Sequence, residues 1–205
     1  MTELTGLWIP DFLFVKKEMA KFILGKKLGM TTIFNDAQEA LNVTLVECVS
    51  KVSMVRSVEK DGYMAVQIEM PKTRKKIAKK EFKVVATEAK VGDEITVDMF
   101  EIGDEVHVTG LGKAKGFQGV VKRHGFKGGM ASHGHKHDLR APGSIGAGYP
   151  EHVIKGKRMA GRMGGKRVTS KNIKVVFIDK AKNLMALKGA VPGVPGAVIE
   201  IYTTK

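Results

Sequence analysis

Cysteine is almost missing from this chain: Cys48 is the only one among 205 residues. A disulfide therefore cannot form within the chain, which is typical of proteins from a reducing compartment. Because Cys48 lies in an alternating apolar run at residues 41–49, we expect it to be a small buried side chain.

The sequence also lacks long hydrophobic runs. None approaches the roughly 20 apolar residues that a membrane-spanning helix needs. Residues 7–15 resemble the apolar core of a signal peptide, but Pro10 and Asp11 interrupt them, no basic residue precedes them and no small-residue cleavage site follows. We therefore expect a cytoplasmic protein with no membrane partner.

Acidic residues are nearly absent from residues 112–168, a segment that we call the arm. It has eight lysines and five arginines against only Asp138 and Glu151, so its net charge is +11 over 57 residues, out of +14 for the whole chain. It also contains 14 of the 24 glycines and shows no sustained apolar period. Such a segment buries too little apolar surface to offset its ordering entropy, so we expect a polyanionic partner to order it.

A disordered linker is the alternative for the arm. Linkers rarely carry apolar anchors, whereas the arm has a scattered set of them: Phe117, Val120, Val121, Phe126, Ile145, Tyr149, Val153 and Ile154. If the arm doubles back on itself, about 28 residues in each direction at roughly 3.3 Å per residue limit its reach to about 90 Å.

The rest of the chain has a β pattern. Runs with β-branched or aromatic residues alternate with turn signals such as Asn35-Asp36 and Asp61-Gly62. They predict strands at residues 23–34, 40–49, 63–70, 94–100, 173–178, 184–188 and 197–202. This spacing predicts a mainly β protein with minor α content, built as an antiparallel β-barrel with the arm inserted between two of its strands.

Two local patterns add to this prediction. The sequence Val-Gly-Asp-Glu-Ile at residues 91–95 recurs as Ile-Gly-Asp-Glu-Val at 102–106, and we expect each copy to be a turn that leads into a strand. Residues 72–82 depart from the β pattern, because Ile77, Ala78 and Phe82 share one side of a short helix after Pro71. The basic residues over the rest of this helix either bind RNA or merely face solvent.

Glycines beside lysines suggest phosphate-binding loops, but the spacing excludes them. Residues 161–166 have the wrong spacing for a P-loop, and Arg167 stands where Ser or Thr would hold magnesium. Lys115 stands where a dinucleotide-binding loop has its third glycine. The arm has too few carboxylates for paired acid–base chemistry, so we expect neither an enzyme, nor a cofactor, nor a small-molecule substrate.

Residues 133–137, His-Gly-His-Lys-His, resemble a metal-binding tract. Only Asp138 is adjacent as a further ligand, and Lys136 and Arg140 would repel a cation. We therefore expect no metal site and favour imidazoles that hydrogen-bond to or stack on RNA. RNA suits the arm as a whole, since glycine lets the backbone approach phosphates, cations neutralise them and aromatic rings stack on bases.

The chain resembles the universal large-subunit ribosomal protein L3 family, in its shorter bacterial form, at five stretches in the family's order. They are residues 24–31 (LGKKLGMT), 112–124 (GKAKGFQGVVKRH), 141–146 (APGSIG), 155–165 (KGKRMAGRMGG) and 175–193. The resemblance as a whole spans residues 19–205. A match of this length and order is specific.

This resemblance implies a translation-factor-like β-barrel at the subunit surface, formed by residues 19–111 and 169–205. It implies that the arm is an extension that penetrates large-subunit (23S-type) rRNA toward the peptidyl transferase centre, with its tip around residues 144–155. The resemblance also implies a structural role, an early part in subunit assembly, and neighbouring ribosomal proteins as partners. It implies that the protein does not form a homo-oligomer. The side chains predicted to contact rRNA are Lys26, Lys27, Lys113, Lys115, Lys122, Arg123, His124, Lys127, His133, His135, Lys136, Arg140, Tyr149, Lys155, Lys157, Arg158, Arg162, Lys166 and Arg167.

Two departures from the family pattern matter. Many relatives have Gln-Asn-Gln after Ser-Ile-Gly, with the second Gln methylated in some, whereas Ala147-Gly148-Tyr149 stands here, so we expect no such modification. Residues 1–18 fall outside the resemblance, and Met19 begins a sequence that reads like the family's own start. Either the chain has a short N-terminal extension, or translation starts at Met19.

Two other classes of function stay open at this point. An RNA-modifying or translation-factor-like enzyme would need a nucleotide or cofactor motif, and none is visible. A membrane-surface or general polyanion binder would need a basic amphipathic helix with a large apolar face, which only residues 72–82 approach.

Overall fold

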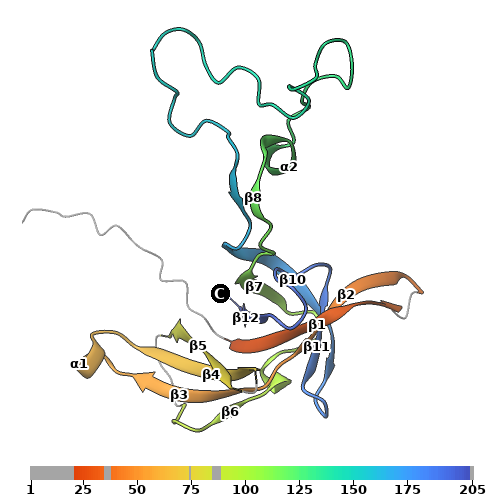
Figure 1. Ribbon diagram of the computed structural model, residues 1–205. Coiled ribbons are helices and arrows are strands. Elements are labelled where there is room, and N and C mark those ends of the chain that lie inside the picture. The colour runs from red at the N-terminus through yellow and green to blue at the C-terminus, as the bar shows by residue number, and fades with distance from the viewer. Residues whose placement is uncertain (1–20, 35–37, 74, 85–88, 204–205) are drawn as a thin grey trace, which may run out of the picture.

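The computed structural model describes residues 21–34, 38–73, 75–84 and 89–203, and these are mainly β, which confirms the predicted fold class (Figure 1). Within them, helical structure consists of α1 (Val58–Asp61), α2 (Val120–His124) and the 3₁₀ turn η1 (Val97–Met99). No helix in this described part of the chain has the length and apolar character to span a membrane. The predicted N-terminal extension, residues 1–18, lies outside the described residues.

Six strands form a closed ring in which every strand pairs antiparallel with two neighbours. The order around the ring is β1, β12, β7, β10, β11 and β2, and β2 pairs back with β1. These strands are β1 (Phe22–Phe34), β2 (Ala40–Glu47), β7 (Glu105–Leu111), β10 (Arg167–Asp179), β11 (Leu184–Lys188) and β12 (Val198–Tyr202). Segments from before and after the arm therefore share one sheet.

Alternate residues of β1 and β12 face two different cores, because successive side chains of a strand point to opposite sides. Ile23 and Ile201 belong to the core inside the ring. Phe22 and Leu24 belong to a second core outside it, and Tyr202 packs against that second core. The outer face of these two strands thus carries apolar side chains, which must be buried against another part of the protein.

A four-stranded sheet supplies this cover. Its order is β5 (Lys76–Lys83), β4 (Ala65–Thr73), β3 (Ser50–Arg56) and β6 (Glu94–Ile95). Phe82 of β5 stacks on Phe22 of β1 with ring centroids 4.9 Å apart. The sequence predicted a single barrel, whereas the structure has a ring and a separate sheet, because β1 and β12 are apolar on both faces.

The predicted helix at residues 72–82 is wrong. Most of this segment is β5, which runs antiparallel to β4 with Phe82 opposite Val66 and Ala78 opposite Met70. Phe82 is 2% exposed, while Ile77, assigned to the same helical side, is 60% exposed. Packing of Phe82 in the second core outweighs a weak local helical pattern.

Several strands agree with the sequence and others do not. Strands β1, β2, β4, β11 and β12 are confirmed to within a few residues, whereas β3 was not predicted and residues 94–100 divide into β6 and η1. Both copies of the short repeat are turns, as predicted. Gly92 and Gly103 have φ values of 99° and 97° and lead into β6 and β7.

Cys48 is fully buried in the core inside the ring, as predicted. Burial raises the pKa of its thiol to about 12, and the charge of Glu47 acts in the same direction. The thiol is therefore uncharged near neutral pH and serves as a packing group.

Candidate nucleic-acid interface

The arm leaves the ring from β7 and returns to it through β10, the strand that is paired with β7 (Figure 1). Leu111 lies opposite Arg167 in this pairing, and the N–H of Gly112 donates to the carbonyl oxygen of Lys166 at 2.9 Å. Because β10 begins at Arg167, the last two residues of the arm already belong to the ring. The arm thus starts and ends at adjacent positions of one sheet.

A short stem carries the outer part of the arm. Strand β8 (Gly116–Gln118) pairs antiparallel with β9 (Gly161–Met163), and α2 follows β8 directly. Beyond this stem, residues 125–160 contain neither helix nor strand. They form two loops that extend away from the ring (Figure 1). None of these elements was predicted from the sequence.

Two glycines let the chain cross itself closely within the arm. Gly164 has a φ of +72°, and a Cβ there would lie 2.0 Å from the carbonyl oxygen of Lys113. Gly128 has a φ of +77°, and its Cβ would lie 2.2 Å from the carbonyl oxygen of Leu139. Only a residue without a side chain fits these positions. Some of the arm's glycines are therefore required by the close backbone contacts within the arm itself.

Most of the predicted contact residues are exposed along the arm. They are Lys113, Lys115, Lys122, Lys127, His133, Lys136, Arg140, Tyr149, Lys155, Lys157, Arg158, Arg162, Lys166 and Arg167. Among the described residues, no carboxylate forms an ion pair with any arm cation except Arg167. Ion pairs within the described part of the chain therefore leave almost all of the arm's positive charge unneutralised.

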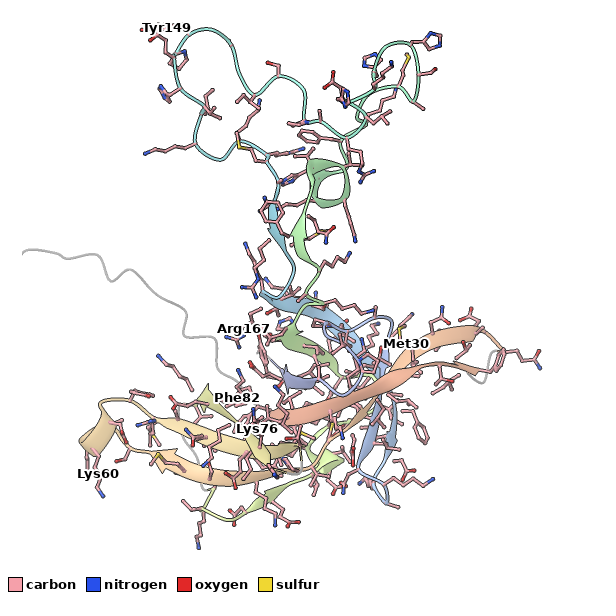
Figure 2. The ribbon with its side chains drawn as sticks, in the orientation of Figure 1. Met30, Lys60, Lys76, Phe82, Tyr149 and Arg167 are labelled. Atoms are coloured by element: carbon pink, nitrogen blue, oxygen red, sulfur yellow. The ribbon has the colours of Figure 1, made fainter. Side chains whose placement is uncertain are left out.

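Large apolar side chains lie exposed among these cations. Phe117 on β8 is 76% exposed and Tyr149, at the far end of the arm, is 88% exposed (Figure 2). Ile154 is 64% exposed. These exposed apolar side chains are distributed along the arm, from the stem at β8 to the far end at Tyr149.

Arg123 and His124 are half-buried and contact the returning chain. The guanidinium of Arg123 donates to the carbonyl oxygen of Met159, and Nε2 of His124 lies 3.0 Å from the same oxygen. A Cβ at Gly161 would lie 2.7 Å from Nη1 of Arg123. Both side chains therefore tie α2 to the segment that leads into β9.

The histidines of the predicted tract do not share one environment. His133 is exposed, whereas His135 is half-buried and lines a hollow of about 740 Å³ with Phe126, Lys127 and Asp138. In the described part of the chain, no three His, Cys, Asp or Glu side chains gather in a way that could hold a metal ion.

The structure corrects the prediction for Lys27. Alternation along β1 places Lys27 on the side of Ile23, inside the ring, and its ammonium donates to the carbonyl oxygens of Val191 at 2.9 Å and Gly193 at 3.2 Å. Burial lowers the pKa of Lys27, and the charge of Lys113 lowers it further. Lys27 therefore fastens the loop before β12 and is only 7% exposed, whereas Lys26 is half-exposed on the other side of β1.

Arg167 is the point where the arm is fixed to the body. Its guanidinium donates to the carboxylate of Glu200 on β12, which also binds the ammonium of Lys80 on β5 at 3.0 Å. The side chain of Glu200 is 9% exposed. One carboxylate thus joins the base of the arm, the ring and the four-stranded sheet. Sequence reasoning missed Glu200, because nothing in a strand pattern marks an acidic residue with two cationic partners.

We predict that Glu200→Gln lowers the free energy of unfolding by roughly 1–2 kcal/mol, because two charge-assisted hydrogen bonds lose their anion. Urea unfolding followed by circular dichroism measures this change. Glu94→Gln is the matched control, since Glu94 pairs with Lys51 at 2.8 Å but both side chains are more than half exposed. Equal urea-unfolding midpoints for the two variants would show that Glu200 stabilises the fold no more than the exposed Glu94 does.

The protein has a mainly β body and a basic, glycine-rich arm whose described cations have almost no acidic partners. This architecture is typical of ribosomal proteins with long extensions. Residues 59–191 match the family model of ribosomal protein L3. This match covers more than half of the chain and includes the whole arm. The chain therefore belongs to the ribosomal protein L3 family, whose members are structural components of the large ribosomal subunit.

Proposed function

We propose that this protein binds large-subunit rRNA through its arm and thereby helps to nucleate assembly of the subunit. The observation that carries the proposal is the set of exposed arm cations that have no carboxylate partner among the described residues. Such cations neutralise phosphates and release the counterions condensed on RNA. The exposed rings of Phe117 and Tyr149 supply surfaces for base stacking.

The proposal assigns different tasks to different parts of the chain. Residues 19–111 and 169–205 form the body, in which the closed ring is a translation-factor-like barrel at the subunit surface that neighbouring ribosomal proteins contact. Residues 112–168 enter the rRNA, and residues 144–155 reach toward the peptidyl transferase centre. The protein shapes that catalytic RNA indirectly and supplies no catalytic group. It acts as a single copy, without cofactor, in the cytoplasm.

The predicted contacts differ in kind within this proposal. The exposed lysines and arginines meet phosphates, and Tyr149 meets a base or a crevice near the tip. Arg123, His124 and Arg167 already have protein partners, so they contribute to RNA binding mainly by holding the arm in shape. Lys27 is excluded because of its burial.

Crosslinking of the intact ribosome followed by peptide mapping tests this proposal. We expect protein–RNA crosslinks to concentrate in residues 112–168, because these residues carry the unneutralised charge. Crosslinks spread evenly over the body, or confined to it, would contradict the assignment of the arm as the main rRNA-binding element.

A further inference from the structure

The hairpin of β4 and β5 holds a second concentration of positive charge. Residues 71–83, which we call the basic hairpin, have seven cations and one acidic residue, a net +6 over 13 residues. The whole chain has +14 and the arm has +11, so the remaining 135 residues have a net charge of −3. The entire positive excess of the protein therefore lies in the arm and the basic hairpin.

Lysines of the basic hairpin fall into two groups. Lys79 pairs with Glu69 at 3.2 Å, and Lys80 pairs with Glu200 at 3.0 Å. Lys83 lies 5.3 Å from the ring centroid of Tyr63. These three side chains have partners within the protein and help to hold β5 on the sheet.

The lysines at the end of the basic hairpin are different. Lys72, Lys75 and Lys76 are exposed, and no carboxylate of the described residues forms an ion pair with them. Glu81, the acidic residue of the basic hairpin, already binds Arg56 at 2.9 Å, and Glu69 of β4 binds Lys79. Within the described residues, no ion pair therefore offsets the positive charge of Lys72, Lys75 and Lys76.

We propose that Lys72, Lys75 and Lys76 form a second RNA-binding site, which contacts the phosphate backbone of large-subunit rRNA separately from the arm. This inference rests on the proposed function, because the same rRNA must be the partner. Lys76 lies on the four-stranded sheet, whereas Tyr149 marks the far end of the arm (Figure 2). Two separated phosphate contacts fix the orientation of the body on the RNA, which one arm alone does not.

Protection of an edge strand is the alternative explanation for these lysines. β5 is the edge strand of its sheet, and lysines on edge strands hinder pairing with other chains. This explanation accounts for Lys79 and Lys83 along the strand. It accounts less well for Lys72 and Lys75, which lie on β4 and in the turn, outside the edge strand.

The test compares two triple variants of the full-length protein that lose the same charge. The first is Lys72→Gln, Lys75→Gln and Lys76→Gln. The second is Lys51→Gln, Lys174→Gln and Lys180→Gln, in which each lysine is exposed but has a carboxylate partner at 2.8, 4.0 and 3.1 Å. Binding to an in vitro transcript of large-subunit rRNA is measured by filter binding between about 50 and 200 mM salt.

We expect the hairpin variant to lower the magnitude of the log–log salt slope by about 2, at roughly 0.7–0.9 per lost phosphate contact. Its affinity near 0.15 M salt should fall roughly 10- to 100-fold, while the control variant stays close to wild type. Superimposable curves for the two variants would overturn the proposal.

Other outcomes are also decisive. If the hairpin variant self-associates while its monomer binds RNA like wild type, the lysines protect the edge strand and the proposal is overturned. If wild-type protein itself shows no salt-dependent binding to the transcript, the proposed function fails. If wild type shows salt-dependent binding and the hairpin variant binds with the same affinity and salt slope, the second site alone is refuted.

Discussion

Replacement of residues 113–165 by Asn-Gly is expected to leave the ring folded and to weaken binding to large-subunit rRNA by on the order of 10³-fold or more. The ring should survive because Gly112 already donates to Lys166 across the β7–β10 pair, and Asn-Gly closes a two-residue hairpin there. No residue of 113–165 belongs to either hydrophobic core. The affinity should fall because about half of the arm's 13 cations are expected to contact phosphate.

Filter binding and urea unfolding of the same preparation separate the two parts of this prediction. The arm should contribute about −5 to the log–log salt slope of wild type, from roughly 0.7–0.9 per phosphate contact, and the replacement should lose this part and retain the smaller part contributed by the basic hairpin. Reconstituted large subunits should not assemble with the replacement protein. An armless protein that supports assembly at the wild-type rate would refute the role assigned to the arm, and an unfolded one would refute the independence of the ring.

The place of the arm could be predicted from composition, because the contrast in charge and glycine content is visible without any contact. Its internal structure could not. The β8–β9 pair consists of three residues on each side, and α2 is a single turn, so neither leaves a periodic pattern. The sequence also does not distinguish the arm's glycines from one another. Gly119 has open space around it, whereas Gly164 lies where the chain crosses itself.

The individual contact residues were harder to predict than the segment that carries them. Lysine is generally exposed, so Lys26 and Lys27 read alike in the sequence, yet alternation on β1 buries one of them. Arg167 reads like any other arm cation, but its partner Glu200 is far away in the chain. The local pattern of residues 72–82 predicts a helix with a basic face, whereas most of the segment pairs with β4, an interaction that the local pattern does not contain.

The same limit applies to two glycines of the stretch at residues 24–31, which look equivalent in the sequence. We predict that Gly25→Ala lowers the free energy of unfolding by roughly 1–3 kcal/mol through overpacking of the core inside the ring. A Cβ at Gly25 would lie 2.3 Å from Cγ1 of Val46 and 3.1 Å from Sγ of Cys48, both fully buried. Neither side chain can move away without displacing others in a close-packed core.

Gly29→Ala is the control for this prediction, because a Cβ at Gly29 meets nothing within 4 Å and its φ is not in the left-handed region. Alanine there should leave stability unchanged or raise it by up to about 1 kcal/mol, since it restricts the unfolded chain. Urea unfolding of both variants measures the difference. If Gly25→Ala is as stable as Gly29→Ala, the ring must accommodate a methyl group beside Val46, and its core would be less tightly packed than the short distances at Gly25 require.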